Sequence, residues 1–120
     1  MATVRHDSPL LRFFYDTVSR SIIGSRQWNE RSELFEASLV DHVQASFPAS
    51  FITDGNKHSF ESQGLAFVSR LEALKVPVRS LFYTETEEDY VHEYQFSYQT
   101  QAGQACLVET VAFLKNIFGT

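Results

Sequence analysis

The most constraining feature of this chain is the order of patterns between residues 47 and 96. A short apolar strand at 50–53 ends in Asp54-Gly55-Asn56, a strong signal for chain reversal. A helical pattern then covers 59–75, with Ser59 as its expected cap, and an extended run follows at 76–83. A strand, a crossover helix and a second strand at this spacing form a βαβ unit with parallel strands. The sequence therefore predicts an α/β fold with a small parallel sheet.

Further helical patterns flank this unit. Pro9 fits the first position of a helix that Asp7 or Ser8 caps and that Gly24 ends. The pattern favours a short helix at 34–43 and a last helix at 102–118 with a broad apolar face. We expect a three-layer α-β-α fragment within one domain, residues 1–120, made of a helical N-terminal segment (1–37) and a second part (38–118).

Composition limits the classes of function. Ten basic against fifteen acidic side chains give a formal charge of −5, without a cluster of Lys or Arg. We therefore expect no nucleic-acid partner and no membrane partner. The start of the chain lacks a long apolar stretch, and no run approaches a membrane span, so we expect a cytoplasmic protein.

The cysteine and the histidines of the chain indicate neither a disulfide nor a metal site. The single cysteine, Cys106, cannot form an internal disulfide and fits a buried small apolar position in the last helix. The four histidines, His6, His42, His58 and His92, are far apart and never at metal-ligand spacing. No glycine-rich phosphate loop is present. We expect neither a metal nor a cofactor.

Several short segments of the sequence, in their order and spacing, resemble the C-terminal part of α/β-hydrolase esterases and lipases, particularly the acetyl-esterase and hormone-sensitive-lipase-like branch. The resemblance covers roughly residues 38–118. The segments that carry it are Phe47-Pro48-Ala49-Ser50-Phe51-Ile52-Thr53-Asp54-Gly55, Gly64, Leu71-Glu72-Ala73-Leu74-Lys75-Val76-Pro77-Val78, Phe82-Tyr83, His92-Glu93-Tyr94 and Phe113-Leu114-Lys115.

The resemblance implies that His92 descends from the catalytic histidine, because it stands where that branch has His-Gly-Phe. An imidazole suits proton transfer since it changes charge near neutral pH and offers two nitrogens. The alternative for His92 is an exposed loop histidine in an acidic neighbourhood. At the usual place of the acid this chain has His58-Ser59-Phe60, so Asp54, at the strand end, is the nearby carboxylate that could orient His92. The alternative for Asp54 is an Asx turn.

The nucleophile of such a site is missing from the chain. No Gly-x-Ser-x-Gly occurs, and no glycine-rich oxyanion loop is present. The resemblance therefore implies a carboxylesterase-type or lipase-type domain that is inactive alone and takes a small ester substrate only when an N-terminal half completes it. The competing hypothesis is a noncatalytic interaction or oligomerisation module derived from the same fold.

Two parallel strands make a very small sheet, so we also expect an open apolar edge at Phe51-Ile52. We expect unmatched helix faces at Phe13, Phe14, Phe67 and Phe113. Such surfaces recruit another chain. The sequence therefore predicts a homo-oligomer, by strand addition or helix exchange, or else a complex with an upstream half.

Overall fold

The computed structural model describes residues 8–24 and 38–120. The chain divides into two compact units, residues 1–43 and 44–120. The first unit contains helices α1 (Pro9–Ile23) and α3 (Leu39–His42). The part of the predicted 34–43 helix before residue 38 lies outside the described residues.

The ends of α1 follow the predicted signals. Pro9 opens the helix after Ser8, which is extended but makes no side-chain capping bond. Gly24 ends it in the left-handed region, at φ 74°, and its N–H donates to the Arg20 carbonyl. A residue with a Cβ adopts this conformation at a cost, so glycine is the favoured stop. Asp7, the other predicted cap, lies outside the described residues.

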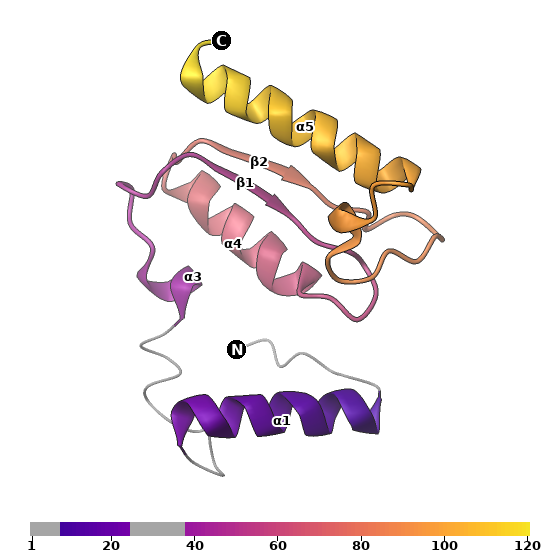
Figure 1. Cartoon of the computed structure of the whole chain (residues 1–120). Helices are drawn as coiled ribbons and strands as arrows, with labels where there is room; N and C mark the ends of the chain where they lie inside the picture. Colours follow the sequence, from indigo (N-terminus) through magenta and orange to yellow (C-terminus); the bar gives the residue numbers. More distant parts are fainter. Residues whose placement is uncertain (1–7, 25–37) are drawn as a thin grey trace. The chain divides into compact units, whose positions relative to one another are not determined.

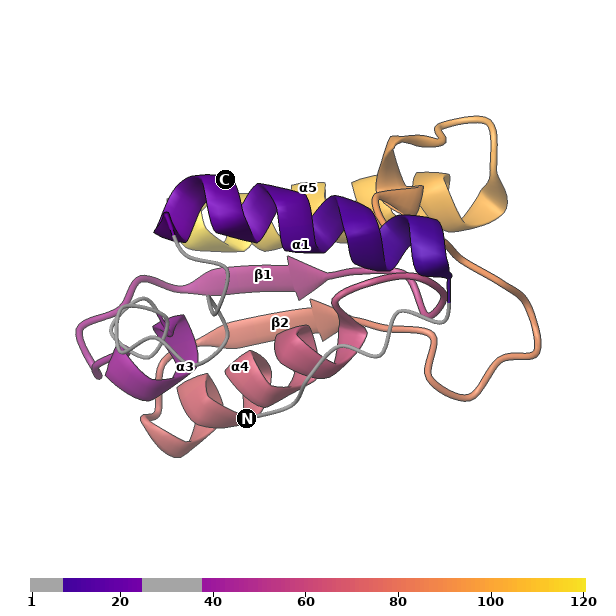
Figure 2. The same cartoon turned by 90° about the horizontal axis from the view of Figure 1, so that it is seen from below.

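The second unit begins with the predicted βαβ unit. Strand β1 (Ser50–Thr53) leads into helix α4 (Glu61–Ala73), and strand β2 (Val78–Leu81) follows. The two strands are parallel, with Ser50 opposite Val78 and Thr53 opposite Leu81. Figure 2 shows them side by side and pointing the same way. The prediction of parallel neighbours is confirmed.

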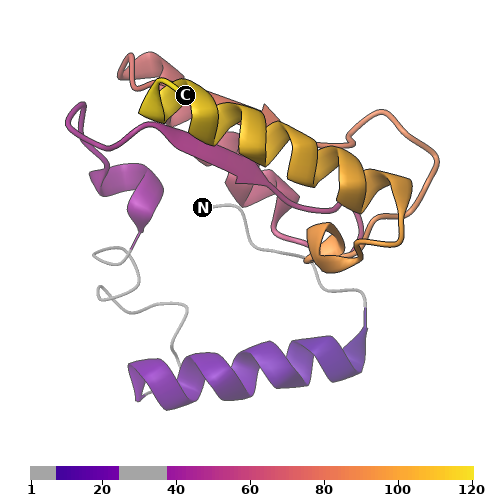
Figure 3. The same cartoon turned by 45° about the horizontal axis from the view of Figure 1, so that its top comes forward.

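Helices cover both faces of this sheet (Figure 1). Phe51 of β1 packs against Phe113 of α5 (Gln101–Phe118), with ring centroids 5.9 Å apart. Ile52 faces the other way, towards Gly64 of α4, since neighbouring residues of a strand point to opposite faces. Figure 3 shows α5 lying along the sheet from a third direction. In the described residues the fold is a mixed α/β arrangement with a two-stranded parallel sheet.

The side chains that hold the second unit together come from both helical layers. Leu71 of α4 is fully buried, and Val68 and Val76 are buried near it in sequence. On the α5 side, Tyr94 of the short 3-10 helix η2 (Tyr94–Phe96) packs with Ala102 and Cys106. The Cys106 side chain is buried as a small apolar group, as predicted.

Three local predictions are wrong. Ser59 does not cap α4; Phe60 takes the capping position, and the Ser59 hydroxyl accepts from Glu61 N–H in a tight local turn. The second strand is shorter than 76–83 and covers only Val78–Leu81. Phe67 and Phe113 are not unmatched, because Phe67 packs on Phe47 and Phe113 on Phe51. Phe13 and Phe14 of α1 are exposed, and whether another chain covers them stays a prediction.

No helix in the described ranges is both long and apolar enough to cross a lipid bilayer.

Candidate functional site

Asp54 is the first residue after β1 and is the one buried carboxylate among the described residues, with 7% of its surface exposed. Its Oδ1 accepts a hydrogen bond from Gly55 N–H at 2.8 Å, and its Oδ2 accepts one from Phe60 N–H at 2.8 Å. A buried carboxylate is tolerated only when donors surround it. The turn after β1 supplies two of them from its own backbone.

The third donor is His92, from the loop after β2. Its Nδ1 lies 2.9 Å from Oδ1 and 3.0 Å from Oδ2 of Asp54. An ionised carboxylate only accepts hydrogen bonds, so the proton of this bond resides on Nδ1 of the histidine. The predicted pair, thirty-eight residues apart in sequence, is therefore brought into direct contact at the carboxyl end of β1.

Gly55 allows this contact. A Cβ built on Gly55 would lie 2.0 Å from the Tyr90 carbonyl oxygen and 2.3 Å from that of Val91. Any side chain there would push the histidine loop away from the end of β1. The glycine is required by this close approach of two backbone segments, rather than by an unusual φ.

Asn56 and Lys57 then fasten the loop to the turn. The Asn56 amide donates to the carbonyls of Tyr83 and Glu88 and accepts from Tyr90 N–H. The backbone N–H groups of Asn56 and Lys57 both donate to the Tyr90 carbonyl. Asn56 N–H is thus committed to Tyr90, and the Asx turn that was the alternative for Asp54 does not form. The Lys57 ammonium also pairs with Asp89.

A buried tyrosine also packs at the carboxyl end of β1, where the turn after β1 and the His92 loop meet; this region is called the polar rim below. The Tyr94 hydroxyl lies 2.7 Å from Thr53 Oγ1, and this threonine hydroxyl also lies 2.7 Å from the Leu81 carbonyl oxygen. Burial raises the pKa of Tyr94 well above its usual value. Because η2 starts only two residues after His92, this packing fixes the end of the histidine loop.

The other ring nitrogen of the histidine faces a different environment. His92 is 43% exposed, and no described residue forms a hydrogen bond with its Nε2. The ring of Phe60 stands edge-on to the imidazole, with centroids 5.0 Å apart. The phenyl ring limits rotation of the imidazole, and the carboxylate selects its tautomer. The arrangement can present Nε2 as a proton acceptor to a group outside the described residues.

In the part of the chain that the structure describes, no three His, Cys, Asp or Glu side chains gather as a metal site would need.

The sequence identified both members of this pair but missed its supporting residues. Phe60 contributes a backbone N–H and a ring, and Asn56 joins the two loops. Little in the sequence indicates these roles, because an asparagine after Asp-Gly is typical of an ordinary turn. The comparisons add no relative to this picture: no family model, no curated protein and no solved structure matches the chain.

Proposed function

We propose that this chain carries the acid–base half of a serine-hydrolase-type site that acts on small carboxylic esters. His92 is the general base, and Asp54 orients its ring. The observation that supports this most strongly is the contact of Nδ1 with a buried carboxylate while Nε2 stays open.

The chemistry follows from this orientation. As a serine hydroxyl attacks the ester carbonyl, Nε2 takes the hydroxyl proton, and the resulting imidazolium is stabilised by the Asp54 carboxylate. The imidazolium then gives the proton to the departing alkoxide, which leaves an acyl-serine. Water repeats the two proton transfers and releases the acid.

The nucleophile and the oxyanion donors belong to a polypeptide segment that completes the site. No Gly-x-Ser-x-Gly is present in these 120 residues. The isolated chain is therefore expected to show no burst and no turnover of an activated acetyl ester above the buffer rate. Under the same assay, His92→Ala is expected to change nothing.

The decisive experiment supplies the missing half. Coding sequence upstream of Met1 is searched for an in-frame Gly-x-Ser-x-Gly, and its product is co-expressed with this chain. We expect ester hydrolysis that falls by about three orders of magnitude or more with His92→Ala. His58→Asn, which removes a histidine outside the pair and keeps a side chain tolerant of the left-handed φ of 50°, serves as the matched control.

Robust turnover by the 120-residue chain alone, abolished by His92→Ala, would show that a nucleophile within the chain was missed. Turnover of the completed protein that survives His92→Ala would refute the role of His92.

The second candidate is a noncatalytic interaction module. It is favoured by the row of apolar side chains that α5 exposes, among them Leu107 and Phe118.

A further inference from the structure

Within residues 8–24 and 38–120, strand β1 pairs along one edge only. Ser50 N–H donates to the Pro77 carbonyl, so the backbone groups of Ser50 face β2. Alternate residues of a strand direct these groups to opposite edges. The N–H and C=O of Phe51 therefore point to the free edge, where no described residue forms a strand beside them. An edge of this kind is a template for another strand.

Helix α5 extends an apolar surface beside this edge. Ala102, Cys106 and Phe113 face the sheet, and Glu109 reaches down one side of the helix to Arg79 of β2. At 3.6 residues per turn, the opposite side of α5 carries a second row. This row, the α5 flank, consists of Leu107, Val111, Leu114 and Phe118, each between 41% and 74% exposed.

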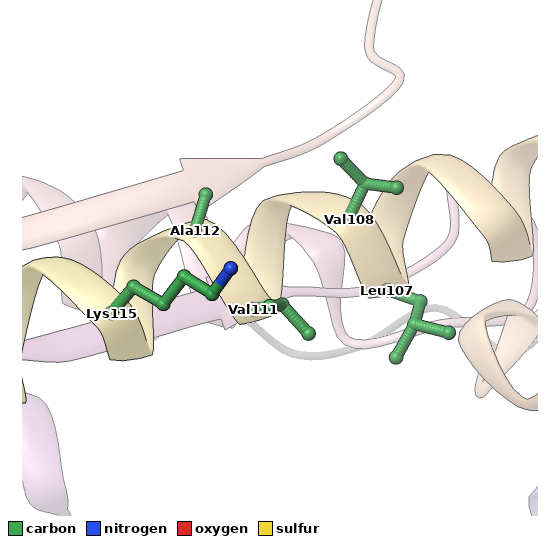
Figure 4. A pocket seen from close by; sticks show the side chains of 5 residues that line it. All are labelled: Leu107, Val108, Val111, Ala112 and Lys115. Atoms are coloured by element: carbon green, nitrogen blue, oxygen red, sulfur yellow. The ribbon is translucent and has the colours of Figure 1, made fainter. Parts of the chain in front are cut away.

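The α5 flank therefore lies on the β1 side of the sheet. Figure 2 shows α5 on the β1 side and α4 on the β2 side. Figure 4 shows Leu107 and Val111 on one side of α5, with Val108 and Ala112 pointing the other way. The shallow apolar depression drawn there is lined by α5 residues alone. It has no converging polar groups from another element, which a small-ligand site would need.

The edge of β2 has the opposite character. Arg79 and Ser80 are exposed on that strand, and Arg79 pairs with Glu109. Charged side chains on an edge discourage strand addition. The β2 edge of the sheet thus disfavours strand addition, whereas the β1 edge favours it.

We propose that a second copy of this chain covers the free edge of β1, with the two β1 strands antiparallel about a two-fold axis perpendicular to the sheet. This axis keeps both α5 helices on the same face and turns each α5 flank towards the other. The result is a four-stranded sheet in the order β2-β1-β1-β2, with polar edges at both ends. The inference is independent of the proposed hydrolase chemistry.

The surface suits a copy of itself better than a charged partner. None of the four residues of the α5 flank is charged, and Lys115, which lines the same depression as Leu107 and Val111, ends in an ammonium on a long flexible side chain that can stay in water. Its four side chains expose on the order of 400 Å² of apolar surface, about the size of the largest patch on a typical monomer. Two flanks and two paired strand edges together approach the roughly 1,000 Å² that a biological interface needs.

The test compares two valines on one helix by sedimentation equilibrium at micromolar concentration. Val111→Asp puts a carboxylate in the α5 flank, and Val108→Asp, at a position 66% exposed on the other side of α5, is its matched control. Both sites are exposed, so neither variant should unfold the chain. We expect a dimer whose dissociation constant rises about tenfold or more with Val111→Asp, and by much less with Val108→Asp.

Hydrogen exchange gives an independent readout of the strand pairing. Protection of the Phe51 amide should rise with protein concentration, whereas the amide of Ser80, on the other edge, should not respond. A monomer at all accessible concentrations would overturn the proposal. So would a dimer equally sensitive to both valine substitutions, or one that leaves Phe51 unprotected.

Discussion

The carboxyl end of β1 and the lateral edge of the same strand differ in whether their polar groups have hydrogen-bond partners. At the end, the Asp54 carboxylate accepts from two backbone N–H groups and one imidazole, and Asn56 makes three side-chain hydrogen bonds. Along the edge, no strand of the described residues lies beside the backbone of Phe51, and the α5 flank lies exposed. Asp54, whose hydrogen bonds are satisfied, thus lies only three positions after Phe51, whose backbone groups lack a neighbouring strand in the described residues.

This difference separates what the chain organises by itself from what another polypeptide must complete. The polar rim is closed by contacts within residues 44–120 and needs no partner to hold its geometry. The apolar edge gains stability only from association. Substitutions at the rim should therefore act on folding, and substitutions at the flank should act on assembly.

Gly55→Ala should have the largest effect on folding. Its Cβ would overlap the Tyr90 and Val91 carbonyls and force the histidine loop away from β1. We expect a loss of about 4 kcal/mol in the free energy of unfolding. Gly119→Ala, where no atom lies within 4 Å but φ is 70°, should lose only about 1 kcal/mol. Urea unfolding measures both, and equal losses would show that the two loops do not pack as described.

Leucine truncations contrast the core with the α5 flank. Leu71→Ala should cost about 3 kcal/mol, because this fully buried side chain leaves a cavity. Leu114→Ala, at a position 45% exposed, should stay within about 0.5 kcal/mol in dilute, monomeric protein. A large loss for Leu114→Ala at low concentration would mean that the monomer already covers this flank.

Two aspartates, each hydrogen-bonded to a basic side chain, should respond differently. Asp54→Asn places an amide N–H₂ against backbone donors that the carboxylate now satisfies, and should cost about 2 kcal/mol. Asp89→Asn breaks only the exposed pair with Lys57 and should cost less than about 0.5 kcal/mol. Similar melting temperatures for the two variants would contradict the buried, donor-rich site.

The smallest effect concerns Tyr94 and alkaline pH. Burial raises the folded-state pKa of Tyr94 above the usual value for tyrosine of about 10, so the folded protein holds this proton more tightly than the unfolded chain. The stabilisation is complete below about pH 10 and falls as the pH rises towards the folded-state pKa. Tyr94→Phe should cost about 1 kcal/mol near neutral pH and should remove part of the alkaline loss. Tyr98→Phe, at an exposed residue, should leave that loss intact.

Much of the fold follows from local sequence patterns. The strand at 50–53, the helix stop at Gly24 and the helical pattern of α5 each depend on signals a few residues long, and each matches the structure. The cap of α4 was misplaced because Phe60 N–H is drawn to Asp54, a contact six residues back that overrides the local preference of Ser59.

The site was predictable only in part, because its geometry depends on distant contacts. Asp54 and His92 stood out by residue type and order. Three contacts of the site join segments that are thirty or more residues apart: the hydrogen bond between Asn56 and Tyr90, the close approach of Gly55 to Tyr90, and the contact of Thr53 with Tyr94. Short spacing rules carry no information about such contacts.

The central claim is that Asp54 holds His92 with its proton on Nδ1 and leaves Nε2 as the open base. Nitrogen-15 NMR of the imidazole, at a pH where the ring is neutral, reports this tautomer directly. We expect the Nδ1–H form in the unmodified chain and in Asp89→Asn, and a shift towards the Nε2–H form in Asp54→Asn. A ring that is mainly Nε2–H in the unmodified chain, or one that ignores Asp54→Asn, would contradict the account.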